Sequence, residues 1–174
     1  MNHLKINLVP VTHDNYPTLF NLARFYEYDI SEFFGDDPSW GIKNDGLYEL
    51  GVNYKKYFED KNASPFLIYH GEQLVGFAIV DKDSIHPSAD FSMAQFFILR
   101  TYKRMGLGKQ AAFQTFEKFP GAWEVRVMPK NETGYHFWKS VISKYTHNHF
   151  DEKILKNNKG EDRIAFLFSN KSTK

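Results

Sequence analysis

The sequence predicts an α+β fold with α/β/α layers, in which four helices cover a mixed, mostly antiparallel sheet of about seven strands. Two observations support this prediction. Apolar residues recur at strand and helix spacing in the order βααβββαβαββ. Only one stretch, residues 93–128, has the strand–helix–strand order that makes two neighbouring strands parallel. The 174 residues, 42% hydrophobic and 25% charged, suit one globular domain, expected over residues 1–174.

The first half of the chain predicts an N-terminal strand, two helices and a hairpin. The strand alternates apolar and polar residues, whereas the helices repeat apolar residues at intervals of three and four. A short polar turn, His70-Gly71-Glu72-Gln73, separates two apolar runs and indicates the hairpin. The expected elements are a strand over 5–9, a helix over 12–22 capped by Thr12 or Asp14, a loop over 29–46, a helix over 47–58, and strands over 66–69 and 74–81.

The second half predicts strands alternating with helices, and then a final hairpin. Pro120 and Gly121 end one helix, and the run Asn157-Asn158-Lys159-Gly160 predicts a turn between the last two strands. The expected elements are strands over 93–99 and 123–128, helices over 107–119 and 134–142, and final strands over 145–155 and 163–168.

Composition and charge exclude several classes of protein. The formal net charge is +1, so the chain lacks the basic excess with which proteins bind nucleic acids. Cysteine is absent, which excludes disulfides, thiolate metal sites and cysteine nucleophiles. No apolar run approaches the ~18 residues of a membrane span, and no signal peptide is visible. We therefore expect a cytoplasmic protein without a membrane partner.

The segment from Phe96 to Gln110 carries the clearest chemical signal. A strand runs into a basic loop, and Gly106 and Gly108 then begin a helix. The first N–H groups of a helix have no partner within it and lie at the positive end of its dipole, so an anion fits there. No Ser, Thr, Asp or Asn is present in residues 102–107 to cap this helix. A phosphate site and a plain helix start with packing glycines both fit these features.

Two phosphate-binding motifs match this segment poorly. A P-loop requires glycine at position 103 and Ser or Thr at position 110, where this chain has Lys103 and Gln110. The pattern Gly106-x-Gly108-x-x-Ala111 matches a dinucleotide-binding fingerprint in letters. However, a long polar turn separates the strand from the first glycine, and the hairpin signals contradict the parallel sheet that this fold requires.

The sequence resembles the GNAT acetyltransferase superfamily in its loop, its last helix and its element order. The run Lys103-Arg104-Met105-Gly106-Leu107-Gly108 is similar to the family's acyl-CoA loop, Gln/Arg-x-x-Gly-x-Gly/Ala, with Lys103 in place of Gln or Arg. Asn131, Phe137 and Trp138 resemble the family string Asn-x-x-Ala-x-x-Phe-Tyr. The predicted order matches the family's order over nearly the whole chain. The resemblance implies an acetyl-CoA-dependent N-acetyltransferase.

The resemblance also implies which residues contact acetyl-CoA. Backbone N–H groups of the loop would bind the pyrophosphate, and its basic side chains would add charge-assisted hydrogen bonds. Main-chain groups of Phe96 and Ile98 would bind the pantetheine arm, and the Phe96 N–H would polarise the thioester carbonyl. Asn131 is expected to bind the same arm or to cap a helix. The expected contact residues are Phe96, Phe97, Ile98, Lys103, Arg104, Met105, Gly106, Leu107, Gly108, Lys109, Asn131 and Phe137.

Acetyl transfer requires a proton donor for the CoA thiolate that leaves. The family often has a tyrosine where this chain has Trp138, and an indole N–H cannot supply a proton at neutral pH. Tyr135 lies one turn earlier on the same predicted helix and is the expected substitute. The alternatives are that the thiolate leaves unprotonated or that water delivers the proton.

A proton acceptor is also needed, because an alkylammonium of pKa about 10.4 must lose a proton before it attacks. The family base is often Glu or Asp on the fourth strand or nearby, where this chain has Ser92 and Gln95. Asp90, Glu124 and His86 are the neighbouring alternatives, and Asp90 is the expected base. A water chain would serve equally.

The acceptor is expected to bind beside the first two helices. Aromatic and acidic residues alternate from Phe25 to Asp37, a composition that suits a cation through charge and cation–π contact. Tyr26, Tyr28 and Glu32 are the expected acceptor residues. We expect a primary amine of a small molecule or peptide, attacking directly in a ternary complex. An ordinary solvated acidic helix end is the alternative.

The alternative function is a non-catalytic acyl-CoA-binding or regulatory module. It would also explain Trp138, Ser92 and Gln95, which replace side chains that the family's chemistry often uses.

His147 and His149 share one strand face if that stretch is extended, but no third ligand accompanies them, so no metal is expected. The edge of the C-terminal hairpin is a possible surface for a homodimer.

Overall fold

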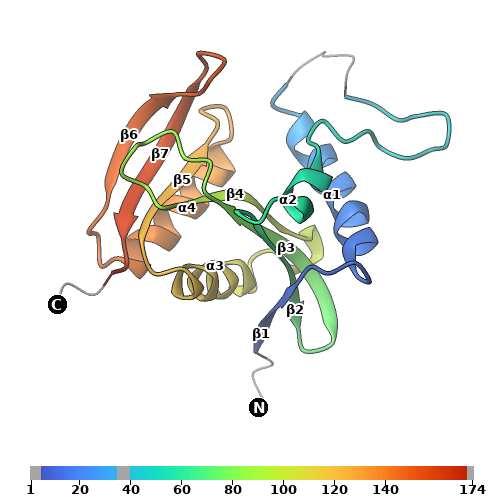
Figure 1. Cartoon of the computed structure of the whole chain (residues 1–174), viewed down its shortest axis with the longest axis horizontal. Coiled ribbons are helices and arrows are strands. Elements are labelled where there is room, and N and C mark those ends of the chain that lie inside the picture. Colours follow the sequence, from blue (N-terminus) through green and yellow to red (C-terminus); the bar gives the residue numbers. More distant parts are fainter. Residues whose placement is uncertain (1–4, 35–39, 172–174) are drawn as a thin grey trace.

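The structure is a computed structural model that describes residues 5–34 and 40–171, and it is built on a seven-stranded sheet (Figure 1). The strand order is β1-β2-β3-β4-β5-β7-β6. β4 and β5 pair in parallel, and every other neighbouring pair in this sheet is antiparallel. The predicted mixed sheet is therefore confirmed. The strands are β1 (Ile6–Pro10), β2 (Ser64–His70), β3 (Gln73–Asp81), β4 (Phe91–Ile98), β5 (Ala122–Val127), β6 (Asp151–Lys156) and β7 (Asp162–Ser169).

The helices connect these strands in the predicted order and cover both faces of the sheet. α1 and α2 pack on one face, and α3 and α4 pack on the other (Figure 1). A short 3-10 turn, η1, follows β4. This arrangement confirms the α/β/α layers. The helical elements are α1 (Tyr16–Ser31), α2 (Tyr54–Glu59), η1 (Arg100–Tyr102), α3 (Leu107–Lys118) and α4 (Glu132–Tyr145).

The alternation of residues along the strands divides the core into two parts. In β3, Phe77 and Ile79 join the cluster under α1 and α2, whereas Ala78 and Val80 join the cluster under α3 and α4. This is the period of two that a strand imposes on its side chains. The same alternation decides which face every side chain of β4 and β5 reaches, and it fixes the composition of the site described below.

The first two helices differ from the prediction in length. α1 begins later, at Tyr16, and continues to Ser31 through a stretch expected to be partly loop. Its N-cap is Asn15 and not Thr12 or Asp14; the Asn15 Oδ1 accepts a hydrogen bond from the Thr12 N–H at 2.7 Å. α2 covers only Tyr54–Glu59, because Asn53 caps it and its Oδ1 accepts from the Lys55 N–H. The apolar residues before Asn53 lie in a loop.

The C-terminal hairpin also begins later than predicted. α4 continues to Tyr145, and β6 starts at Asp151. His147 adopts a φ of 52° in the intervening turn. The expectation that His147 and His149 share a strand face is therefore wrong, because this stretch turns instead of extending.

A bulge in β4 separates it from β5 and opens the sheet. Val80 pairs with Met93 and Ile79 pairs with Gln95, so Ala94 is an extra residue in β4. Such a bulge bends its strand. Only Phe91 and Ser92 of β4 pair with β5. Beyond this rung the two parallel strands part, and the main chain of β4 from Met93 onward has no strand on its β5 side.

Candidate active site

The separated half of β4 presents free main-chain groups to the gap between β4 and β5. The Leu99 N–H donates to the Val75 carbonyl at 2.8 Å, which fixes the hydrogen-bonding side of the strand. By the alternation of an antiparallel ladder, Phe97 also bonds to β3, whereas the N–H and C=O groups of Phe96 and Ile98 face the gap. Two of the three predicted β4 contacts are thus directed to the gap, and the main chain of Phe97 is directed away from it.

The start of α3 lies beyond the end of β4 and presents unpaired N–H groups. Gly106 is the N-cap, with a φ of 77° and no side-chain cap, and Arg104 has a φ of 66°. The Gln110 N–H donates to the Gly106 carbonyl at 3.2 Å. None of the described residues accepts a hydrogen bond from the N–H groups of Leu107, Gly108 or Lys109. These three donors at the positive end of the helix dipole form an arrangement that suits a phosphate.

Gly108 and Phe137 join the helix start to the gap. A Cβ built on Gly108 would lie 3.2–3.3 Å from the Phe137 ring and 3.5 Å from the Ile98 side chain. The Phe137 ring also stacks on Phe96, with ring centroids 5.8 Å apart. The predicted residues of β4, α3 and α4 are therefore in contact with one another, and only a glycine leaves the first turn of α3 open beside the aromatic ring.

Basic side chains surround this helix start, and two of them bind α1. The Arg100 Nη2 lies 2.6 Å from the Asp29 Oδ1, and the Lys103 Nζ lies 3.4 Å from the Asp29 Oδ2. Arg104 and Lys109 are exposed. Exposed ion pairs contribute at most about 1 kcal/mol. Lys103 can therefore exchange Asp29 for a phosphate at little energetic cost.

Asn131 and Trp138 occupy structural positions in α4. Asn131 caps the helix, and its Oδ1 accepts from the Gly134 N–H at 2.7 Å. Its amide nitrogen has no hydrogen-bond partner among the described residues, so Asn131 can cap the helix and donate to a ligand at once. Trp138 is buried against Phe96 and Phe116. It extends the core where the family string has a tyrosine.

Tyr135 points toward β6 and β7 and not toward Phe96. Its hydroxyl donates to Glu152 at 3.0 Å and accepts from the Lys139 Nζ at 2.7 Å, and its ring packs on Phe166. The structure therefore does not bring Tyr135 together with the other predicted site residues.

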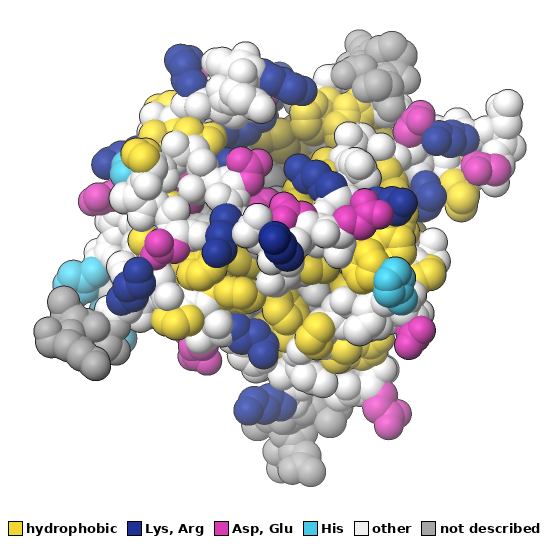
Figure 2. All heavy atoms as spheres, viewed as in Figure 1, with side chains coloured by type: hydrophobic (Ala, Val, Ile, Leu, Met, Phe, Trp, Pro, Cys, Tyr) yellow, Lys and Arg dark blue, Asp and Glu magenta, His cyan; other side chains and the backbone are white. Residues whose placement is uncertain are grey.

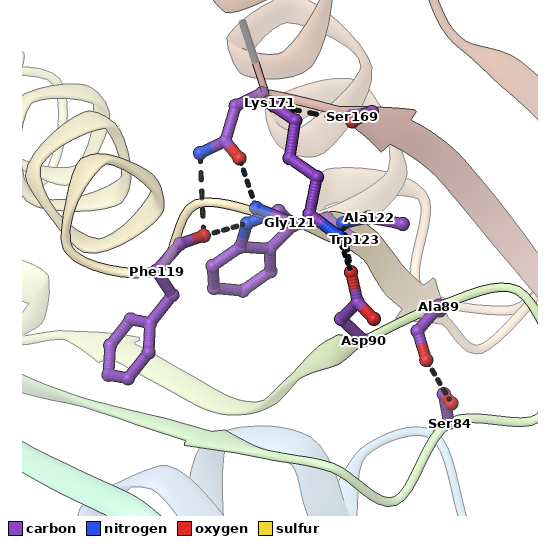
Figure 3. Close-up of polar contacts among 10 residues, drawn as sticks. Ser84, Ala89, Asp90, Phe119, Gly121, Ala122, Trp123, Ser169 and Lys171 are labelled. Atoms are coloured by element: carbon purple, nitrogen blue, oxygen red, sulfur yellow. Dashed lines mark hydrogen bonds and ion pairs between the residues drawn. The ribbon is translucent and has the colours of Figure 1, made fainter.

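Asp90 lies at the paired end of β4, opposite the gap (Figure 3). It accepts from the Ala122 N–H at 2.9 Å and from the Lys171 Nζ at 2.9 Å. These hydrogen bonds lower the pKa of Asp90, which makes it a weaker base. Six residues separate it from Phe96, about 20 Å along a strand. Asp90 joins the starts of β4 and β5 and is remote from the predicted reacting atoms.

Glu124 and His86, the two other expected bases, belong to a connection that Glu124 stabilises. Glu124 is fully buried, and its carboxylate accepts from the backbone N–H groups of Ile85 and His86 at 2.9 and 2.7 Å. Arg126 lies 3.4 Å from it. The His86 ring bonds to Ser88. Glu124 therefore anchors the β3–β4 connection to β5.

Of the three expected acceptor residues, one faces the sheet. Tyr26 packs its ring against Phe77 and Phe97. Tyr28 is 61% exposed and contacts Tyr48 edge to face, and Glu32 is exposed at the end of α1. In the stretch from Phe25 to Phe34, Tyr26 and Glu27 turn inward, whereas Phe25, Tyr28, Glu32 and Phe34 are exposed. Positions 35–37 of the aromatic and acidic stretch lie outside the described residues.

Two buried carboxylates were missed by the sequence-based prediction. Glu27 on α1 accepts from the Tyr54 hydroxyl at 2.8 Å, and burial raises its pKa. Asp81 ends β3 and is 7% exposed. A usable signal was present for both, because Glu27 follows Leu19 and Ala23 at helical spacing, and Asp81 follows Phe77 and Ile79 at strand spacing. Charged residues in apolar register are buried on the inner face.

The face drawn in Figure 2 shows no field of one charge among the described residues. Basic and acidic side chains are interspersed over the face drawn in Figure 2. Among residues 5–34 and 40–171, no three His, Asp or Glu side chains come together as a metal site. No helix in this part of the chain has the length and apolar character needed to cross a membrane.

Comparison with known proteins identifies a family and a common fold. The model of the "Acetyltransferase (GNAT) family" matches residues 22–141. No curated protein sequence matches the chain. A crystal structure of an acetyltransferase from Thermus thermophilus is 17% identical, with a TM-score of 0.67, and the match covers 97% of this chain and 99% of that one.

Two other solved structures share the fold at lower identity. A chimaeric spermidine N-acetyltransferase from Vibrio cholerae and a second source is 11% identical, with a TM-score of 0.56 and 95% of each chain covered. A Bacillus anthracis protein in complex with acetyl coenzyme A is 10% identical, with a TM-score of 0.56, and the match covers 97% of this chain and 99% of that one. At these identities the likeness shows the fold alone.

Proposed function

Because the chain belongs to the acetyltransferase (GNAT) family, we propose that it transfers the acetyl group of acetyl-CoA to a primary amine. One observation carries the proposal. The free main chain of β4 and the uncapped start of α3 lie side by side and are joined by Gly108 and Phe137. A thioester with a pyrophosphate-bearing arm requires such a pairing of an extended edge with an anion site.

The chain's own groups suit the two chemical parts of CoA. The N–H groups of residues 107–109 would bind pyrophosphate oxygens, with Lys103, Arg104 and Lys109 supplying positive charge. Main-chain groups of Phe96 and Ile98 would bind the pantetheine amides, and Phe137 would pack beside them. Asn131 would add its amide N–H. The Phe97 main chain bonds to β3, so Phe97 does not belong to this set.

The chemical contribution of the protein is hydrogen bonding at the acyl carbon. Acetyl-CoA supplies an activated thioester. The Phe96 N–H would donate to its carbonyl oxygen and stabilise the negative charge that develops there during amine attack. Such a donor can lower the transition-state free energy by ~3 kcal/mol. This contribution comes from the backbone, so substitution of the Phe96 side chain tests packing and not catalysis.

We infer that the acceptor is a cationic amine that approaches from the α1 and α2 face. This face carries Tyr26, whose ring can contact a cation, and buried carboxylates on α1 and β3. The fold is shared with a spermidine N-acetyltransferase. Tyr28 and Glu32 point to solvent, so they are not included in the acceptor site.

One observation favours a second function, a non-catalytic acyl-CoA-binding module. The Tyr135 hydroxyl bonds to Glu152 and Lys139, and Trp138 fills the core, so neither supplies a proton at the gap. A binding module needs no proton donor. The two functions differ in whether CoA is released when an amine is added.

Thermal unfolding with acetyl-CoA, CoA and NAD in parallel tests the shared binding step. A ligand at 100 times its Kd adds about 2.7 kcal/mol to the unfolding free energy. We expect acetyl-CoA and CoA to raise Tm and NAD to leave it unchanged. Absence of a shift with both CoA species would overturn the proposal.

Thiol release with an amine panel then separates the two functions. The panel contains spermidine, a peptide with a free N-terminus, and an N-blocked peptide with one lysine. Release of CoA that depends on an amine supports the transferase. Binding without release by any amine supports the module instead.

A further inference from the structure

A row of buried polar side chains crosses three strands at the point where the sheet opens. Asp81 of β3 pairs with Ser92 of β4, and Ser92 pairs with Glu124 of β5. Residues directly opposite on neighbouring strands share a face. The three side chains are 7%, 0% and 0% exposed. They lie on the face of Phe77 and Ile79, which α1 and α2 cover.

Two members of this row have obvious structural partners, and the third does not. Glu124 holds the β3–β4 connection through two backbone N–H groups. The Ser92 Oγ accepts from the Arg126 Nη2 at 3.2 Å. Asp81 accepts only the Asp83 N–H, at 3.1 Å to its Oδ1, among the described residues. Its second oxygen is therefore available to a proton or a water molecule.

α2 connects Asp81 with the reacting end of β4. The Tyr57 hydroxyl accepts from the Gln95 Nε2 at 3.4 Å, and Gln95 directly precedes Phe96. In β3, Ile79 lies two residues before Asp81 on the same face and pairs with Gln95, so Asp81 and Gln95 are diagonal neighbours across the β3–β4 pair. Burial raises the pKa of Tyr57, and the charges of Asp81 and Asp83 raise it further. The Tyr57 and Asp81 side chains are not hydrogen-bonded to each other, and a water molecule between them would complete a path.

The charges that face Asp81 come from three elements. Burial raises its pKa to about 6, and Asp83, on the connection that follows β3, raises it as well. Arg126 of β5 and Lys56 of α2 act in the opposite direction. Glu124 of β5 shares the row. A carboxylate with this pKa is ionised at neutral pH and is a stronger base than an exposed one.

We propose that Asp81 accepts the proton of the attacking amine, through a water molecule and the Tyr57 hydroxyl that Gln95 orients. This inference rests on the proposed function. The acceptor ammonium loses one proton along this path, and its nitrogen then bonds to the thioester carbon. The carbon–sulfur bond breaks, with its electron pair on sulfur. A second proton leaves the nitrogen and neutralises the CoA thiolate, and Asp81 returns its proton to solvent. Asp81 acts through other groups and is a positioning residue.

Asp81→Asn tests the proposal, because the amide keeps the oxygen that accepts the Asp83 N–H. The measurement is kcat/KM for spermidine at saturating acetyl-CoA from pH 5 to 9. For the wild type we expect activity that rises through about pH 6 and then levels. For Asp81→Asn we expect a loss of about 100-fold or more at pH 7.5. Its activity should rise about tenfold per pH unit to pH 9, because only the neutral amine then reacts.

Asp83→Asn is the matched control, since it removes the neighbouring charge and keeps its backbone N–H. Its profile should keep the acidic limb, moved to slightly lower pH. Tyr57→Phe is the second variant: it keeps the ring and removes the hydroxyl, and it should lose at least tenfold at neutral pH. Acetyl-CoA affinity, measured by calorimetry, should stay within threefold of wild type for all three.

The outcomes separate this inference from the proposed function. A wild type that releases no CoA with spermidine or any other panel amine overturns both. A wild type that is active, with Asp81→Asn matching its rate and its acidic limb, overturns the role of Asp81 alone. If Asp81→Asn fails to bind acetyl-CoA, the Tyr57→Phe variant tests the proton path instead. An unchanged kcat/KM for spermidine in Tyr57→Phe would then overturn the path.

Discussion

Asp81 combines burial with a single hydrogen bond among the residues that the structure describes, so its ionisation opposes folding. Its pKa is about 6 in the folded chain and 3.8 in the ordinary case. A group whose pKa is raised on folding contributes stability below its unfolded pKa, and this contribution is lost as pH rises through the folded value. The loss occurs between about pH 4 and pH 6.

This linkage predicts that Asp81→Asn becomes more stable relative to wild type as pH rises. Each pH unit between the two pKa values is about 1.4 kcal/mol, so the difference should grow by up to about 3 kcal/mol from pH 4 to pH 8. Urea unfolding at the two pH values measures it. A difference that does not change with pH would contradict burial of the ionised carboxylate. A loss of activity together with a gain of stability is the pattern expected of a functional residue.

Substitution of Gly108 should weaken acetyl-CoA binding without a matching change in the free energy of unfolding. In Gly108→Val the new side chain meets the Phe137 ring, and it covers the first N–H groups of α3. We expect acetyl-CoA affinity to fall at least tenfold, while the unfolding free energy of the free protein changes by about 1 kcal/mol or less. Glu117→Val, at an exposed position of the same helix, is the control and should bind normally. Equal affinity in both variants would place the phosphate site elsewhere.

Single residues differ in how far the sequence predicts them. Gly106 and Gly108 are identifiable because a local pattern, strand to basic loop to helix, determines their surroundings. The hydrogen bonds of Asp90 could not be predicted from its neighbours in the sequence, because its partner Lys171 is 81 positions away. The strand spacing after Phe77 and Ile79 indicates that Asp81 is buried, but its partners depend on the register of β3 against β4 and on the packing of α2, which no local pattern encodes.

At the scale of elements, the close approach of β3 to β4 fixes the position of the part of β4 that has separated from β5. A Cβ on Gly76 would lie 1.9 Å from the Phe97 carbonyl oxygen, a backbone atom that cannot move without shifting β4. Gly76→Ala should therefore destabilise the protein by about 3 kcal/mol or more and reduce acetyl-CoA binding. Urea unfolding and calorimetry measure the two effects.

Gly41→Ala is the matched control for Gly76→Ala. Its Cβ would meet no atom within 4 Å among the described residues, so the unfolding free energy should change by less than about 0.5 kcal/mol. Equal losses in the two variants would show that glycine flexibility, and not the contact with Phe97, is responsible.

The order of elements was predictable, whereas two helix lengths were not. Strong periodicity identified β2 to β5, α3 and α4. The C-terminal half of α1 was missed because Phe25 and Tyr28 are exposed aromatics that break the apolar stripe. The apolar residues before α2 belong to a loop, in which Leu47 is exposed and Leu50 packs against the cluster under α1 and α2, so their helical spacing is coincidental. Tertiary packing, not local preference, decides both cases.

At the scale of the molecule, one sheet separates two environments. In the proposed site, the α3 and α4 face would contribute the start of α3 and Phe137, and the α1 and α2 face would contribute Tyr26, Tyr57 and Asp81. The gap between β4 and β5 joins them. The chain order predicted this architecture because seven strands with one crossover allow few arrangements. The sequence also indicated an acceptor beside the first two helices and named Tyr26, but it did not predict Tyr57 or Asp81, whose partners are distant in sequence.

Nuclear magnetic resonance of acetyl-CoA labelled with carbon-13 at the carbonyl tests the central claim most directly. The labelled thioester is mixed with catalytic amounts of the protein and an excess of spermidine. We predict that the thioester signal is replaced by an amide signal on spermidine, in step with the appearance of CoA thiol. A thioester signal that persists, or that becomes free acetate, would contradict transfer to an amine.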